Sequence, residues 1–222
     1  MTETARDGAR HAVIGYAHRM LAERLVSATA GNLSARVAGE PGAIAMTPTG
    51  LPYDALELDD ICVVGTGGER IAGRRAPTSE RPLHTLLYAR RPELGAIVHT
   101  HSPAAMTMAV LGWPLPPILT GLVEAAGGDV RVAPYATPGS DELAEGVAEA
   151  LADRGACFLR HHGLVAVGAD LAHAFRAASV TEVSARVYLD ARAQRIDVPE
   201  LAPADVAEIA RAWRSQWVRA VA

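Results

Sequence analysis

The sequence has little of the features that mark secreted, membrane-bound or nucleic-acid-binding proteins. Its only two cysteines, Cys62 and Cys157, are too few for a framework of disulfide bridges. Its net charge of -4 gives no field that would attract nucleic acid or anionic membranes. It has no long uncharged apolar run that could span a bilayer, and its first residues lack the apolar core of a signal peptide. We therefore expect a cytoplasmic protein with no nucleic-acid and no membrane partner.

The composition that is present is typical of a globular protein with a sizeable core, since 50% of the 222 residues are hydrophobic and 21% are charged. Apolar spacing, caps and proline stops predict helices over residues 7–27, 80–90, 140–152, 170–194 and 203–218, and Ser102-Pro103 marks one more helix start. Short apolar runs predict strands that include residues 43–46, 61–64, 96–101, 130–133, 157–160 and 164–167. Because helices and strands are interspersed without a linker or repeat, we expect a single α/β/α three-layer domain over residues 1–222.

Three histidines are the strongest candidates for a metal site. His99 and His101 lie in the run Ala-Ile-Val-His-Thr-His, whose β-branched and apolar residues predict a strand. Residues two apart on a strand point to the same face, so both imidazoles can bind one ion, and His162 can supply a third ligand. The alternative is a pair of core histidines satisfied by hydrogen bonds. His161 diverges in direction from its neighbour His162, so we expect only one of the two to bind. The other histidines lie in helical patterns and are expected to be surface or packing residues: His11, His18, His84 and His173.

Glu80 stands at the start of a predicted helix, where the helix dipole alone would favour a carboxylate. Thr78 and Ser79 precede it, and free amides at the helix start together with the two hydroxyls would form an anion site. Small residues in loops at strand ends would let further backbone amides approach an oxyanion, and these residues are Gly31, Asn32, Thr49 and Gly50. Together they suggest a phosphate pocket beside a metal ion.

The ordered set of these segments resembles the class II aldolase/adducin-type family, and within it the branch of fuculose-phosphate aldolases. The similar segments span residues 29–188. They include Thr-Ala-Gly-Asn at 29–32, Thr-Ser-Glu at 78–80, the histidine run at 96–101 and Arg-His-His-Gly-Leu at 160–164. The resemblance implies a central, mostly antiparallel sheet, and it implies a homotetramer with active sites between subunits.

The resemblance also implies roles for the candidate residues. One zinc ion per subunit would be held by His99, His101 and His162, with Glu80 as acid/base and as a ligand displaced by substrate. The phosphate contacts would come from Gly31, Asn32, Thr49, Gly50, Thr78 and Ser79. The expected reaction is the reversible cleavage of a ketose 1-phosphate, L-fuculose 1-phosphate or a related deoxyketose 1-phosphate, to dihydroxyacetone phosphate and a short aldehyde. The expected partner is therefore a small sugar phosphate.

The chain departs from this branch on the aldehyde side of the site. The tyrosine that similar enzymes use there falls on or near Gly121, and their C-terminal tyrosine is also missing, so that the nearest aromatic residues are Trp213 and Trp217. Glu124 could instead serve an epimerase, decarboxylase or dehydratase on the same metal site. A non-catalytic adducin-like interaction domain is the third interpretation. Such a domain should have lost metal ligands, whereas this chain retains all four candidates.

Overall fold

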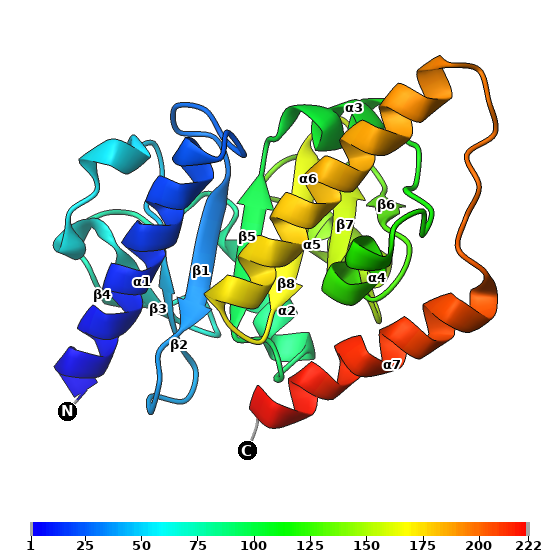
Figure 1. Ribbon diagram of the computed structural model, residues 1–222. Helices are drawn as coiled ribbons and strands as arrows, with labels where there is room; N and C mark the ends of the chain where they lie inside the picture. Colours follow the sequence, from blue (N-terminus) through cyan, green and yellow to red (C-terminus); the bar gives the residue numbers. More distant parts are fainter. Residues whose placement is uncertain (1, 221–222) are drawn as a thin grey trace.

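A computed structural model describes residues 2–220, so the ends of the expected domain, residues 1, 221 and 222, lie outside the described residues. One open eight-stranded sheet runs through this part of the chain in the order β4-β3-β2-β1-β5-β8-β7-β6 (Figure 1). Its strands are β1 (Asn32–Arg36), β2 (Ala43–Met46), β3 (Cys62–Gly65), β4 (Arg70–Ala72), β5 (Ala96–Thr100), β6 (Arg131–Ala133), β7 (Ala156–Leu159) and β8 (Gly163–Gly168). Every neighbouring pair is antiparallel except β6 and β7, which confirms the expected mostly antiparallel sheet.

Helices cover both faces of the sheet and complete the three layers (Figure 1). The apolar cluster on one face includes residues of α1 (Thr2–Ala22), α3 (Pro103–Leu111), α4 (Thr120–Ala126) and α6 (Leu171–Ala193). The cluster on the other face includes residues of α2 (Arg81–Arg90) and α5 (Asp141–Leu151). The last helix, α7 (Pro203–Ala220), crosses the end of the molecule beside α4.

Alternation along the strands divides the buried side chains between the two clusters. On β2, Ala45 belongs to the cluster under α1 and α6, whereas Ile44 and Met46 belong to the cluster under α2 and α5. On β5, Val98 faces the first cluster and Ile97 faces the second. Successive side chains of a strand point to opposite faces, so short apolar runs such as these can fill two cores at once.

Most expected elements are found within a few residues of their predicted bounds, and the differences have local causes. The first helix ends at Ala22 rather than at residue 27, because Arg24 takes a positive φ of 57° and the amide of Leu25 bonds back to the carbonyl of Met20. The glycine turn after β3 is a hairpin turn that leads into β4, a strand that the sequence did not predict. The short helix α4 was also missed.

In the described part of the chain, no helix is long and apolar enough to cross a membrane.

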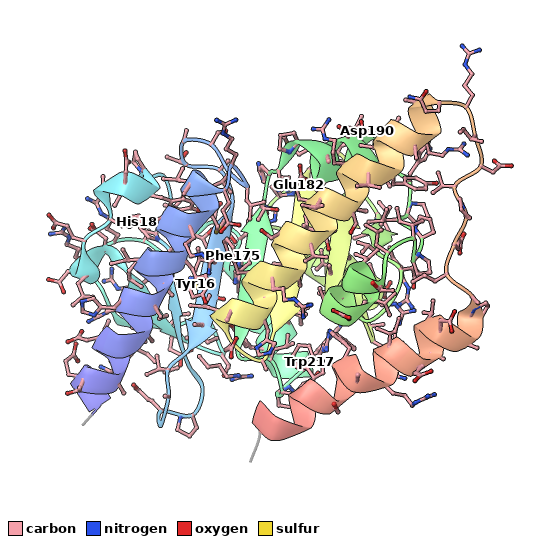
Figure 2. All side chains as sticks on the ribbon, viewed as in Figure 1. Tyr16, His18, Phe175, Glu182, Asp190 and Trp217 are labelled. Carbon is pink, nitrogen blue, oxygen red and sulfur yellow. The ribbon has the colours of Figure 1, made fainter. Side chains whose placement is uncertain are left out.

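The helix that follows the histidine strand is capped from a distant part of the chain. Ser102 precedes α3, but its side chain makes no cap hydrogen bond. Instead Glu182 of α6, labelled in Figure 2, accepts hydrogen bonds from the amides of Ala104 and Ala105, each at 2.8 Å. The first amides of a helix have no partner within the helix, and a carboxylate there is favoured by the helix dipole. Glu182 therefore ties α6 to the first turn of α3, which begins two residues after His101.

We expect Glu182→Ala to lower the free energy of unfolding by about 1–2 kcal/mol, because two helix amides lose their acceptor. Urea denaturation followed by circular dichroism measures the change. Glu124→Ala is the matched control, since Glu124 forms an exposed ion pair with Arg176, and it should change stability by no more than about 0.5 kcal/mol. Equal stability of Glu182→Ala and the wild type would show that the cap contributes nothing.

Candidate active site

Three imidazoles meet where β5 ends and β8 begins. His99 lies in β5, His101 follows this strand directly, and His162 immediately precedes β8. The three rings are nearly equidistant, with centroid separations of 4.8, 4.8 and 4.9 Å. One nitrogen from each ring lies within 4.8 Å of the others, so this group could hold a metal ion. His161 takes a positive φ of 57° and its ring lies 6.2 Å from that of Tyr135, away from the group.

The ring of His99 is held in the tautomer that a metal needs. His99 is fully buried, and its Nδ1 lies 2.9 Å from the carbonyl oxygen of Leu164 on β8. Since a carbonyl oxygen only accepts, Nδ1 carries the proton and Nε2 presents its lone pair to the centre of the group. Burial lowers the pKa of His101 to about 3 and that of His162 to about 4, so both imidazoles are neutral at neutral pH.

Glu80 adds a carboxylate to the three imidazoles. It occupies the cap position before α2, yet its side chain does not cap the helix. Its Oε2 accepts a hydrogen bond from Nδ2 of Asn32 at 2.8 Å and lies 3.1 Å from Nε2 of His99, while its Oε1 lies 3.6 Å from Nε2 of His162. Burial alone would raise the pKa of Glu80, but His99, His162 and the Asn32 hydrogen bond outweigh it, so this pKa lies below its usual value. The hydrogen bond from Asn32 thus directs the carboxylate toward the imidazoles rather than toward the helix amides.

The surroundings of Glu80 fit a divalent cation. Its Oε1 is buried and has no hydrogen-bond partner. A buried carboxylate oxygen without a partner is costly, and a cation between it and the imidazoles would compensate that cost. Three nitrogen ligands with one oxygen ligand are a donor set that suits zinc, and three fixed ligands leave a position for substrate.

The expected phosphate residues lie around Glu80 on three segments. Gly31 and Asn32 enter β1, Thr49 and Gly50 follow β2, and Thr78 and Ser79 precede α2. The second and third segments are joined by the hydrogen bond from the amide of Thr78 to the carbonyl of Thr47. Tyr53 ties the second segment to the first, because its hydroxyl donates to the carbonyl of Gly31 at 2.6 Å. Gly31 has a φ of +72°, and a Cβ there would lie 2.5 Å from the carbonyl oxygen of His99, so a larger residue would push the segments apart.

The expectation of free amides at the start of α2 is wrong. The amide of Arg81 bonds to the carbonyl of Thr78, and that of Leu83 bonds to the carbonyl of Glu80. Pro82 between them has no N–H. An anion here would depend on the hydroxyls of Thr78 and Ser79 and on loop amides, because the helix offers no free donor in its first turn.

The expected aldehyde-side residues do not reach the three histidines within one chain. Glu124 pairs with Arg176 at 2.9 Å, and both line a small hollow beside Gly168, at the far end of β8 from His162. A strand of this length spans roughly 16 Å. Trp213 and Trp217 line the same hollow. Gly121 lies in another hollow, which it shares with Leu119 and residues 179–184 of α6, and no histidine lines this hollow in the described part of the chain.

His84 is a packing residue, one of the two expected alternatives, but its contact with the site was not predicted. It is fully buried, and its Nε2 lies 2.6 Å from Oδ1 of Asn32. The signal that could have identified it is its spacing, because residues four apart on a helix share a face and Glu80 precedes His84 by four.

The sequence and the architecture both have known counterparts. The sequence profile of the Class II Aldolase and Adducin N-terminal domain family matches residues 11–189. A 5-deoxy-D-ribulose 1-phosphate aldolase of Bacillus thuringiensis serovar kurstaki is 38% identical over 199 residues, which are 90% of this chain and 92% of that protein. A 5-methylthioribulose-1-phosphate/5-deoxyribulose-1-phosphate aldolase of Rhodospirillum rubrum is 39% identical over 204 residues, or 92% of this chain and 90% of that protein. A solved structure of an L-fuculose 1-phosphate aldolase shares 32% sequence identity and a TM-score of 0.88, covering 93% of this chain and 96% of that chain.

We expect the protein to bind one divalent ion tightly, and His99→Ala, His101→Ala and His162→Ala each to lose it, because two imidazoles are too few for tight binding. Elemental analysis of purified variants measures the metal content. His161→Ala is the matched control, since its ring lies away from the group, and it should retain the ion. Loss of metal from His161→Ala together with retention by His162→Ala would contradict the assignment.

Proposed function

The chain belongs to the class II aldolase and adducin family, and we propose that it is a zinc-dependent aldolase that cleaves a deoxyketose 1-phosphate to dihydroxyacetone phosphate and a short aldehyde. The observation that carries the proposal is the buried Glu80 carboxylate beside three imidazoles, with one oxygen held by Asn32 and the other without a partner. A metal site with an adjoining base can carry out reversible carbon–carbon cleavage next to a carbonyl, because the ion stabilises the negative charge and the base transfers the proton.

A divalent ion at the three imidazoles would supply Lewis-acid polarisation of the substrate's carbonyl and hydroxyl oxygens. Glu80 handles the proton. When the C3–C4 bond of the ketose breaks, its electron pair stays on C3. Glu80 takes up a proton and delivers it to that carbon, and the proton lost from the C4 hydroxyl balances the one gained. In the direction of condensation the Glu80 carboxylate removes the same C3 proton.

The phosphate would be bound where the three loop segments meet beside Glu80. Thr78 is buried and Ser79 is exposed, so the pocket is open on one side to an incoming ligand. Asn32 has a second amide hydrogen besides the one on Glu80, and Thr49 and Gly50 lie exposed on the neighbouring turn. We infer that these residues, with Gly31, hold the phosphate while C1 to C3 of the ketose lie over the imidazoles.

The substrate class follows from what similar enzymes share and where this chain differs. Cleavage between C3 and C4 leaves the same three-carbon phosphate from 5-deoxyribulose 1-phosphate and from fuculose 1-phosphate. The released aldehyde has two carbons in the first case and three in the second. Gly121 offers no side chain to bind an aldehyde oxygen, and we infer an enzyme that accepts several short aldehydes.

The other functions have less support. An epimerase, decarboxylase or dehydratase would use Glu124, which pairs with Arg176 at the far end of β8. A non-catalytic interaction domain would have no need of a buried carboxylate beside three imidazoles. One zinc ion per subunit, a cytoplasmic location and a homotetramer are further parts of the proposal, and exposed apolar residues on α6 support association with other copies: Val183 and Val187.

We expect Glu80→Gln to lower turnover by about 10²–10⁴-fold, because glutamine is nearly isosteric but cannot accept the proton. Binding of dihydroxyacetone phosphate should survive. Exchange of the C3 proton of this ligand with solvent, followed by NMR in deuterium oxide, reports the step directly. Glu124→Gln is the matched control and should exchange at the wild-type rate. Loss of activity in the control instead would favour the epimerase, decarboxylase or dehydratase.

The identity of the aldehyde is tested by kcat/KM for fuculose 1-phosphate, 5-deoxyribulose 1-phosphate and shorter analogues. We expect these values to lie within about 100-fold of one another, because apolar contacts separate substrates by only about 1–3 kcal/mol per methylene. A preference of several orders of magnitude would show that a placed hydrogen bond selects the aldehyde. No cleavage of any of them by the metal-loaded enzyme would overturn the proposed function.

A further inference from the structure

A chain of buried polar side chains leads from Glu80 into the layer between the sheet and α2. Asn32 and Ser34 alternate with apolar residues on β1, so both point to the face that α2 covers. His84 and Tyr88 lie four residues apart on α2, so they share a face of that helix. All four side chains are at most 4% exposed. Two polar residues on the sheet are thus matched by two polar residues on the helix, inside an otherwise apolar layer.

Hydrogen bonds join these groups end to end. Glu80 Oε2 is bonded to Nδ2 of Asn32 at 2.8 Å, and Oδ1 of Asn32 is bonded to Nε2 of His84 at 2.6 Å. Nδ1 of His84 is bonded to the hydroxyl of Ser34 at 2.6 Å, and this hydroxyl lies 3.0 Å from that of Tyr88.

The chemistry of each group fixes the direction of every bond. The Glu80 carboxylate can only accept, so the Asn32 amide nitrogen donates to it and the Asn32 oxygen faces His84. Burial lowers the pKa of His84 to about 3, so the ring is neutral, and the proton it donates to Asn32 is on Nε2. Nδ1 is then an acceptor, and the Ser34 hydroxyl donates a hydrogen bond to it. Burial raises the pKa of Tyr88, so its phenol stays protonated and donates to Ser34.

We propose that His84 is a positioning residue for the proton transfer by Glu80: its Nε2–H holds the Asn32 oxygen, so that the Asn32 amide holds Oε2 of Glu80 and leaves Oε1 to face the reacting carbon. The proposal rests on the proposed function. A flipped Asn32 would set its oxygen against the carboxylate and its amide against the Nε2–H of His84. His84 thus makes one orientation of Asn32 strongly preferred, although it touches neither the three imidazoles nor the substrate.

The backbone makes this arrangement rigid. Asn32 on β1 lies directly opposite His99 on β5 in the antiparallel pairing. The sheet register therefore fixes the position of Asn32, which orients Glu80, relative to the candidate metal ligand His99. Gly31, just before it, already approaches the carbonyl oxygen of His99 closely. Asn32 has little freedom except rotation of its amide group, and the hydrogen bond from His84 removes that freedom.

Two substitutions of His84 distinguish the role of its Nε2 from that of its Nδ1. The amide of glutamine reaches the position of Nε2 and can still donate to Asn32, whereas the shorter asparagine reaches only the position of Nδ1. We expect His84→Asn to lower kcat and the C3 proton exchange of dihydroxyacetone phosphate by about 10–100-fold, the usual effect of losing a group that orients a reacting residue. We expect His84→Gln to recover most of that loss. Both variants should keep the full metal content, and His173→Gln, at an exposed histidine of α6, is the control.

The outcomes separate a positioning role from a structural one. If His84→Asn exchanges at the wild-type rate, or if both variants lose activity only in proportion to a lower melting temperature, the inference is wrong. If the wild type catalyses neither cleavage nor exchange, the proposed function fails first and the positioning role fails with it.

A measurement without substrate tests the same hydrogen-bond direction even if a variant folds poorly. In protein labelled with ¹⁵N-histidine, the His84 signals, assigned by their loss in His84→Gln, should show the neutral ring with its proton on Nε2 from pH 5.5 to 8.5. A neutral ring with its only proton on Nδ1 would overturn the inference, because Nε2 could then not donate to Asn32.

Discussion

Removing an ionised carboxylate from water costs several kcal/mol, and the elements around Glu80 are arranged to compensate that cost. The residue is 5% exposed. One of its oxygens is bonded to Asn32, and the other faces His162 without a hydrogen bond. One carboxylate oxygen thus keeps a hydrogen-bond donor, and the other oxygen remains available to a cation or a proton. That imbalance suits a group that must exchange partners during a reaction, since a fully satisfied carboxylate would be a poor base.

The sheet makes this arrangement possible because three of its strands meet at the site. β1 contributes Asn32, β5 contributes His99, and β8 begins just after His162 and supplies the carbonyl of Leu164 that orients His99. Antiparallel pairing fixes the register of these strands, so the relative positions of the side chains are set by backbone hydrogen bonds rather than by loops. Glu80 then enters from the start of α2, and Glu182 holds the start of α3 on the other side of His101.

The sequence was sufficient to predict the parts of the fold and of the candidate site that follow from local periodicity. Two histidines two apart in a β-branched run had to share a face, and this predicted the pairing of His99 and His101. Because neighbouring residues diverge in direction, the sequence also predicted that only one of His161 and His162 would join them, and the structure places His162 in the group. The start of α2 was predicted correctly, but the expectation that its first amides are free was wrong. The amides of Arg81 and Leu83 bond to carbonyls of the preceding turn, and Pro82 has no N–H. His84 was expected as a surface or packing residue, but its hydrogen bond to Asn32 was not predicted, because a histidine in a helical pattern does not reveal its partners. Its meaning emerges only when Asn32 and Ser34 are seen on the face of the sheet that α2 covers.

The residues on the aldehyde side of the site could not be predicted from the sequence for a different reason. Position in the chain does not determine distance in space. Glu124 and the two tryptophans stood out as polar and aromatic residues in the segments that differ from similar enzymes, yet they cluster beside Gly168, at the other end of β8. In the proposed function, the groups that bind the three-carbon phosphate half of the substrate come from neighbouring strand ends and from the start of α2. No comparable set in the described part of the chain would face the departing aldehyde. Such a division would permit the aldehyde to vary while the chemistry at C3 stays the same, because in the proposed reaction Glu80, Asn32 and the imidazoles act only on atoms that every ketose 1-phosphate shares.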